Sequence, residues 1–238
     1  MSEPTHPVLR RATAEGIGTA TLVATVVGSG IMATRLSADI GLQLLINALA
    51  TVAALAVLIW SLGPVSGAHF NPAVTLVAAS RRELAWAEAG LYVAAQVLGA
   101  VAGTVVAHLM YGLPAITAST HVRTGAGQWL GEVVATAGLL SLIGALTRTG
   151  NGRLGPALVP AWIGAAYFFT SSTSFANPAV TIGRSVTDSF SGIAPGSVLG
   201  FVAAQLVGAA LGAALTELFH PRTGIPEPLD LPAPVHER

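Results

Sequence analysis

The pentapeptide NPAVT occurs twice in the chain, at Asn71–Thr75 and again at Asn177–Thr181. Asparagine is a favoured helix N-cap and proline is favoured at the first helical position, so each copy predicts the start of a helix. The helix after Asn71 has room for about ten residues before Arg81 and Arg82, which is about 15 Å, or half of a bilayer. A helix that begins inside a bilayer must have its first N–H groups satisfied within protein or a water-filled cavity.

The composition is typical of a membrane protein. Of the 238 residues, 53% are apolar and 9% are charged, against about 25% charged residues in soluble domains. Five uncharged stretches reach the roughly 20 residues of a membrane-spanning helix, and a sixth does so if the charge of Glu132 is satisfied inside a bundle. We therefore expect six transmembrane spans rather than a soluble protein with a very apolar core. These stretches are 16–34, 40–70, 89–120, 133–147, 154–183 and 189–216.

The two NPAVT copies lie in two related halves of the chain. Glu15 and Glu132 stand at the start of the first and fourth spans, and Gln96 and Gln205 lie in the third and sixth. The paired glutamates, asparagines and glutamines are 117, 106 and 109 residues apart and follow the same order. Each half then has three spans, an odd number, so the halves insert with opposite orientation as an inverted repeat. The two short helices would enter from opposite faces, with their N-termini meeting near the midplane.

The arginines predict the orientation of the chain. Eight of them would flank one side of the membrane and three the other, and the positive-inside rule then places both termini in the cytoplasm. We expect one domain over 1–219, with repeats at about 10–112 and 127–219, in the inner (plasma) membrane of the cell. Five prolines and no apolar period predict a disordered cytoplasmic tail at 220–238. The eight arginines are Arg10, Arg11, Arg81, Arg82, Arg148, Arg153, Arg222 and Arg238, and the three are Arg35, Arg123 and Arg184.

Several classes of function are disfavoured by the sequence. The chain has no cysteine, which excludes disulfides, thiolate chemistry and zinc–thiolate sites. No basic run is longer than two residues, so a nucleic-acid partner is not expected. No nucleophile–base–acid set and no metal cluster stands out, so we expect no catalytic residue, no metal, no cofactor and no enzymatic activity.

Small-residue spacings, Gly99-x₃-Gly103 and Gly208-x₃-Gly212, indicate close helix packing.

The stretch SGAHFNPAVT (Ser66–Thr75), the second NPA and the paired glutamates and glutamines resemble the aquaporin and aquaglyceroporin family over about residues 10–219. The resemblance implies an all-α fold with six transmembrane helices and two re-entrant half-helices, a pore in each protomer, and a homotetramer that conducts small neutral solutes through the lipid bilayer. It implies that Glu15 and Glu132 support the re-entrant loops, although a proton relay is an alternative for them. The pore motifs would be Asn71, Pro72, Ala73, Asn177, Pro178 and Ala179.

The chain departs from this family after the second NPA. The family usually has an arginine there, at the narrowest and outermost constriction, and this chain has Val180. Tyr167 and Phe168 are alternatives to Ala165 in the filter. The filter would be wide and neutral, and we expect it to pass water together with glycerol, urea or a metalloid hydroxide such as arsenite. Spacing from the motifs places the filter at Thr51, Ala165, Ser174 and Val180.

Arg184 follows Val180 by four residues, and so falls on the same helix face one turn further on. It would guard the pore mouth and attract anionic solutes, or extend to lipid headgroups, or pair with Asp188. The pattern FANPAVTIGRSVTD resembles a bacterial branch of aquaglyceroporins linked to arsenical resistance, which implies arsenite and methylated arsenicals as solutes. A secondary transporter, which also uses inverted repeats, and a mainly water-conducting aquaporin are the alternatives.

Overall fold

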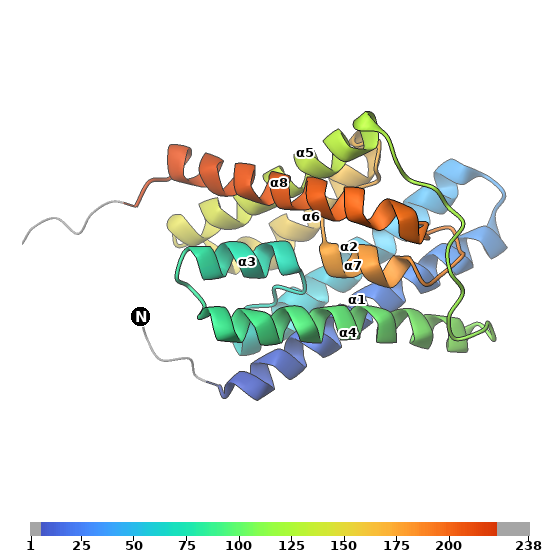
Figure 1. Cartoon of the computed structure of the whole chain (residues 1–238), viewed down its shortest axis with the longest axis horizontal. Coiled ribbons are helices and arrows are strands. Elements are labelled where there is room, and N and C mark those ends of the chain that lie inside the picture. The colour runs from blue at the N-terminus through green and yellow to red at the C-terminus, as the bar shows by residue number, and fades with distance from the viewer. Residues whose placement is uncertain (1–5, 223–238) are drawn as a thin grey trace, which may run out of the picture.

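The structure, a computed structural model, describes residues 6–222. These residues form eight α-helices and one 3₁₀ turn, η1 (Gly152–Leu154), arranged as an elongated bundle (Figure 1). The expected disordered tail falls almost wholly on 223–238, outside the described residues. The helices are α1 (Val8–Leu36), α2 (Ile40–Ser66), α3 (Pro72–Ser80), α4 (Trp86–Met110), α5 (Ala126–Arg148), α6 (Gly155–Phe169), α7 (Pro178–Arg184) and α8 (Pro195–Phe219).

Five of the helices, α1, α2, α4, α5 and α8, are long and apolar enough to cross a membrane. The helix of the fifth span, α6, has only 15 residues, or about 22 Å at 1.5 Å per residue. The composition of the uncharged stretch 154–183 alone indicates one long helix, but the structure does not have one there. The stretch is divided between α6, an irregular loop and α7, because the Asn177–Pro178 pair begins a new helix inside the apolar stretch.

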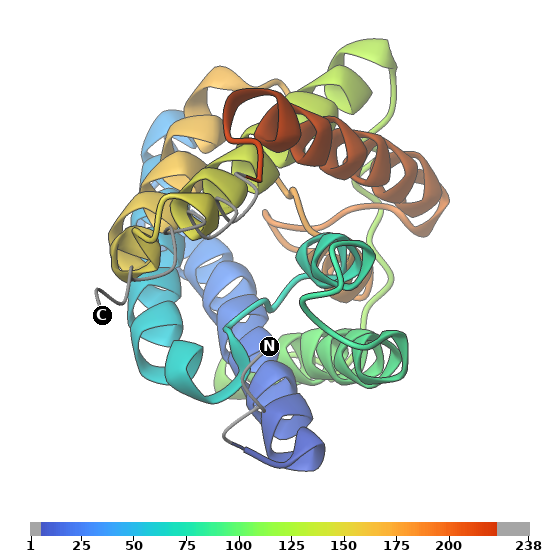
Figure 2. The same ribbon diagram turned by 90° about the vertical axis from the view of Figure 1, so that its left-hand side faces the viewer.

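The two short helices begin where the repeated motif predicts. Asn71 and Asn177 are the N-caps of α3 and α7, and the Oδ1 of each accepts a hydrogen bond from the backbone N–H two residues on, at 2.9 and 3.0 Å. The helices have 9 and 7 residues. They lie nearly end to end, with their N-termini facing each other (Figure 1), and α8 and α4 lie above and below them when the bundle is viewed along its long axis (Figure 2). The predicted half-helices are confirmed.

The long helices pack in matching pairs in the two halves. The most extensive helix contacts are those of α1 with α4 and of α5 with α8. A Cβ on Gly99 or Gly103 would lie 2.2 Å from a backbone oxygen of α1, and one on Gly208 or Gly212 would lie 2.5 or 2.4 Å from a backbone oxygen of α5. The predicted close packing at these glycines is confirmed. Because no side chain intervenes, the helix backbones approach closely.

Each half-helix also contacts the opposite half of the chain. Helix α3 packs on both α4 and α8, and α7 packs on both α8 and α4. The N-terminal end of α1 and the C-terminal end of α8 lie at the same end of the bundle (Figure 1). At that end Arg11 pairs with Glu88 at 2.6 Å, and both Arg81 and Arg148 pair with Glu217. The half-helices are thus fixed by long helices from both repeats.

Candidate functional site

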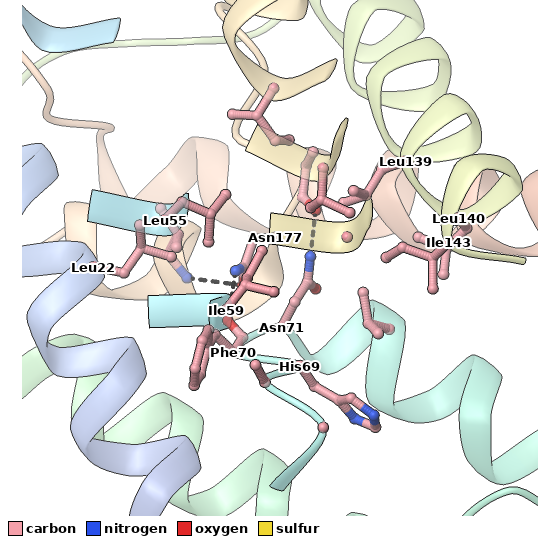
Figure 3. Close-up of a pocket in the computed structure, with 18 of the residues that line it drawn as sticks. Leu22, Leu55, Ile59, His69, Phe70, Asn71, Leu139, Leu140, Ile143 and Asn177 are labelled. Carbon is pink, nitrogen blue, oxygen red and sulfur yellow. Dashed lines mark hydrogen bonds between the residues drawn. The ribbon is translucent and has the colours of Figure 1, made fainter. Parts of the chain in front are cut away.

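A cavity of about 310 Å³ passes alongside the two half-helices. At one end it is lined by Arg81 and Thr147, which lie at the C-terminal ends of α3 and α5, and at the other end by Arg184, at the C-terminal end of α7. Its walls between these ends are largely apolar, with leucine and isoleucine side chains of α1, α2 and α5 on opposite sides (Figure 3). A polar solute in this space would depend on the few polar groups that face it.

The two asparagines lie at the centre of the cavity and join the two halves (Figure 3). Asn71 Nδ2 donates to the carbonyl oxygen of Ala176 at 2.7 Å, and Asn177 Nδ2 donates to that of Phe70 at 2.7 Å. A side-chain amide has two N–H donors, and each of these bonds uses one. The second donor of each asparagine therefore remains for a molecule in the cavity. The facing N-termini of α3 and α7 add partial positive charge at the same place.

The loop before α3 is held by Glu15. Its carboxylate accepts hydrogen bonds from the Ser66 hydroxyl at 2.6 Å, from the backbone N–H groups of His69 and Phe70 at 2.9 and 2.6 Å, and from Gln96 Nε2 at 2.9 Å. The side chain is fully buried and does not line the cavity. Buried carboxylates are costly unless such donors surround them, and here two backbone groups and two side chains do so.

Glu132 holds the second loop in the same way. It accepts hydrogen bonds from the backbone N–H groups of Phe175 and Ala176, both at 2.8 Å, and from Gln205 Nε2 at 2.6 Å. Like Glu15, it is fully buried and lies away from the cavity. The matching contacts of the two glutamates give both loops the same anchor.

Both loops have a backbone that these anchors must hold in place. Ala68 and Phe70 in the first loop have φ of 50° and 47°, and Ser174 and Ala176 in the second have φ of 51° and 48°. A non-glycine residue in this left-handed region costs about 1–2 kcal/mol. The conformation turns the carbonyl oxygens of Phe70 and Ala176 toward the asparagines, which donate to them. The left-handed residues therefore stand where the two half-helices meet.

Three of the four expected filter residues line the cavity, namely Thr51, Ser174 and Val180. Thr51 Oγ1 donates to the Asn47 carbonyl at 2.8 Å and lies 3.3 Å from the Tyr167 hydroxyl. The Ser174 hydroxyl is buried and has no hydrogen-bond partner within residues 6–222. A buried hydroxyl without a partner is unfavourable.

The expectation for Ala165 is wrong. Ala165 is exposed on the outer face of α6 and does not line the cavity, whereas Tyr167 is buried and lines it. Residues two apart point in different directions on a helix, so a small error in counting moves the position from the cavity to the outer surface. Phe168, the other alternative, is also exposed.

Arg184 lines the cavity and is 3% exposed. Its Nε donates to the Ser191 carbonyl, and its guanidinium carbon lies 3.4 Å from the centre of the Phe175 ring. The alternative pairing with Asp188 does not form, because the Asp188 carboxylate accepts instead from Thr120, at 2.8 Å from the backbone N–H and 2.9 Å from the hydroxyl. These two hydrogen bonds lower the pKa of Asp188.

The sequence reasoning missed Arg123 and Phe175. Arg123, in the loop between α4 and α5, donates from Nε to the Gly192 carbonyl at 2.8 Å and stands 5.2 Å from the Phe175 ring centre. Burial lowers the pKa of Arg123. Phe175 lies two residues before Asn177 of the second motif, but nothing in the sequence relates it to an arginine 52 residues earlier. Within residues 6–222 no cluster of three or more His, Cys, Asp or Glu residues could hold a metal ion.

Comparison with known proteins agrees with this architecture. The family model described as "Major intrinsic protein" matches residues 3–175. The aquaglyceroporin AqpS of Rhizobium meliloti (strain 1021) is 55% identical over 206 residues, which are 87% of this chain and 88% of that protein. A probable aquaporin of Arabidopsis thaliana, NIP7-1, is 35% identical over 139 residues, 58% of this chain and 50% of that protein.

The fold is also that of a solved structure. The aquaglyceroporin from Plasmodium falciparum superimposes with a TM-score of 0.66 and 19% identity, covering 90% of this chain and 96% of that one. Since the family model matches most of the chain and AqpS is similar over nearly its whole length, the chain belongs to the major intrinsic protein family and is a membrane channel for small neutral solutes, not an enzyme.

Proposed function

We propose that the cavity is the pore of this channel and that it conducts water together with larger uncharged solutes, namely glycerol or metalloid hydroxides such as arsenite. In this proposal Asn71 and Asn177, each with its Pro and Ala, form the central station. A solute oxygen accepts from the free asparagine donors there, while the positive ends of α3 and α7 oppose cations and interrupt a chain of waters. Glu15 and Glu132 hold the loops and take no part in the passage of solute.

The observation that carries this proposal is the neutral set of side chains at the filter, one helix turn before Arg184. Thr51, Tyr167, Ser174 and Val180 all face the cavity, and none is charged. Val180 supplies no hydrogen-bond donor where the family usually has an arginine. The Ser174 hydroxyl, which has no partner in the described part of the chain, offers one polar contact to a hydroxylated solute. This set supports passage of solutes larger than water.

The refinement to arsenicals rests on Val180 and on the resemblance of the surrounding sequence to the arsenical-resistance branch. The name of the relative AqpS, an aquaglyceroporin, supports the broader class of solute. Arsenite is an uncharged trihydroxide at neutral pH, so it presents oxygens much as glycerol does. We propose arsenite as a solute and methylated arsenicals as further ones.

We further propose a homotetramer in the inner (plasma) membrane with both termini in the cytoplasm. Large apolar side chains such as Trp60, Leu98 and Leu199 are highly exposed on the long helices. Surfaces of this kind suit contact with lipid or with other subunits. The arginines Arg11, Arg81 and Arg148 form ion pairs at the end of the bundle where α1 begins and α8 ends, which supports the orientation.

A solute panel tests the pore. Proteoliposomes that contain the purified protein would be mixed in a stopped-flow instrument with an osmotic gradient, which measures water flux. Gradients of glycerol, urea, arsenite and methylarsenate would measure the flux of each solute. We expect flux of water and glycerol that rises linearly with the gradient, because a channel with weak sites does not saturate. Water flux without glycerol flux would support a water channel instead. Saturable uptake driven by pH against a gradient would support a transporter.

A further inference from the structure

Two arginine side chains lie over one phenyl ring, that of Phe175, at the outer end of the cavity. The guanidinium carbons of Arg184 and Arg123 lie 3.4 and 5.2 Å from the centre of the Phe175 ring. An aromatic face attracts a guanidinium, most strongly where water is excluded. Phe201 packs edge-on against Phe175, with ring centres 5.1 Å apart, and so fixes the orientation of the ring. The position of Arg184 is thus set by packing and not by a carboxylate.

The guanidinium of Arg184 has unused donors. It is 3% exposed, it lines the cavity, and its only hydrogen bond to residues 6–222 is from Nε to the Ser191 carbonyl. It forms no ion pair with any carboxylate in that range. An arginine has five N–H donors, so the four of its two terminal nitrogens remain without a protein acceptor. A buried charge left in this way is costly unless something in the cavity accepts from it.

The surroundings of these donors are short of negative charge. Asp188, four residues after Arg184, is engaged by Thr120, and the carboxylate of Glu132 is occupied by the loop N–H groups and Gln205. Arg123 adds a second positive charge on the same ring. The Ser174 hydroxyl, also on the cavity wall, has no partner among the described residues. Donors and positive charge therefore converge without a matching acceptor.

We propose that Arg184 and Ser174 form a binding site for a small monoanionic oxyacid at the outer end of the cavity, and that Phe175 positions the guanidinium for it while Arg123 adds positive charge. A planar guanidinium offers two parallel N–H groups to two oxygens of such an anion, which a spherical ion cannot use in the same way. The bound anion would occupy the path of neutral solutes. The inference rests on the proposed function, because its ligand enters through the proposed pore.

The test is inhibition of glycerol flux by methanesulfonate, a small tetrahedral anion that stays charged throughout the usable pH range. Methanesulfonate would be present at equal concentration on both sides of the proteoliposome membrane, with chloride, a spherical anion that cannot accept from two parallel N–H groups in the same way, as the reference anion. We expect glycerol flux to fall by about half at a concentration on the order of 10 mM, as for a weak site. Equal flux in the two anions would overturn the proposal.

Variants assign the effect to the site. Because Arg184 lines the cavity, the inhibition is measured in each variant as the ratio of glycerol flux with methanesulfonate to glycerol flux with the reference anion. Arg184→Gln should lose the inhibition, and Arg184→Lys should retain part of it, because the charge remains and the planar pair of donors does not. Phe175→Leu should weaken the inhibition through loss of the ring. Arg35→Gln is the matched control, since Arg35 also lies over an aromatic ring, Tyr111 at 4.8 Å, but is exposed and away from the cavity. Inhibition that persists in Arg184→Gln, or disappears in Arg35→Gln, contradicts the proposal.

A measurement without flux separates this site from the proposed function. A ligand that binds the folded protein raises its Tm, and methanesulfonate should therefore raise the Tm of the purified wild type but not that of Arg184→Gln. Such a result supports the site even if glycerol does not pass, in which case the proposed pore function alone fails. An identical Tm response in the two proteins overturns the site even if glycerol passes freely.

Discussion

The side chain of each asparagine in the repeated motif serves both halves of the chain at once. The Oδ1 of Asn71 caps its own half-helix, while its Nδ2 donates to the carbonyl oxygen of Ala176 in the other loop. Asn177 makes the matching pair of bonds, to its own helix and to Phe70. An aspartate would have no N–H to donate and a glutamine would be too long to cap in this way. This explains why the same residue recurs in both copies.

Val180 lines the cavity, and its replacement by arginine is a sharp test of the proposed filter. Val180→Arg adds a long charged side chain to the cavity wall, one turn from Arg184. We expect glycerol flux to fall by about tenfold or more, since the size of a pocket discriminates on that scale, while water flux falls much less. Stopped-flow light scattering with proteoliposomes measures both. Val180→Leu adds volume without charge, so its glycerol flux should lie between that of the wild type and that of Val180→Arg.

The filter assignment would be contradicted by an equal loss of water and glycerol flux in Val180→Arg, or by no loss of either. An equal loss would mean that the arginine closes the cavity or disturbs the loop. Detergent-solubilised protein should remain monodisperse in each variant, which distinguishes a narrowed pore from a misfolded chain.

At the scale of the elements, the half-helices are stabilised more by the hydrogen bonds and helix contacts around them than by the helix propensity of their own residues. Helix α7 has 7 residues, too few to be stable alone. It is fixed by the Asn177 cap, by Glu132 through the preceding loop, and by packing on α4 and α8. The motif spacing was sufficient to predict both helix starts, because a cap and a proline act locally. The partners of Glu132 could not be derived, since they depend on how the loop folds back.

The crossing of α1 and α4 depends on the absence of a side chain at Gly103. Gly103→Ala would place a Cβ 2.2 Å from the Ala20 carbonyl oxygen, so the helices must separate. We expect a loss of about 1–3 kcal/mol in the free energy of unfolding, the usual range for overpacking. It would be measured by reversible unfolding in mixed micelles.

Gly90→Ala on the same helix is the control for this packing. A Cβ at Gly90 would meet nothing within 4 Å, and the residue is exposed. Because alanine is the better helix former by about 1 kcal/mol, this variant should be neutral or slightly stabilised. A similar loss in both variants would show that close packing at Gly103 is not the cause.

At the scale of the whole molecule, the repeat in the sequence made the fold predictable. The irregular loops limited the prediction of the filter residues. Three pairs of landmarks in the same order were enough to indicate an inverted repeat, because three spans in each half reverse its direction. Ala165 was placed in the filter by counting across 170–176, where three residues with positive φ, Thr173, Ser174 and Ala176, turn the chain. The pairing of Arg123 with Phe175 joins residues with no shared pattern.

The orientation of the chain can be tested directly, because the protein has no cysteine of its own. Ala115 lies exposed in the loop between α4 and α5, and Thr149 lies exposed just after α5, at the end of the bundle where Arg148 pairs with Glu217. If both termini are cytoplasmic, a membrane-impermeant maleimide should label intact cells that carry Ala115→Cys and not those that carry Thr149→Cys. After the cells are lysed, both should be labelled. The opposite pattern in intact cells would show that the orientation is reversed, with Arg184 at the cytoplasmic mouth. The arginine-rich end would then face outward, against the positive-inside rule.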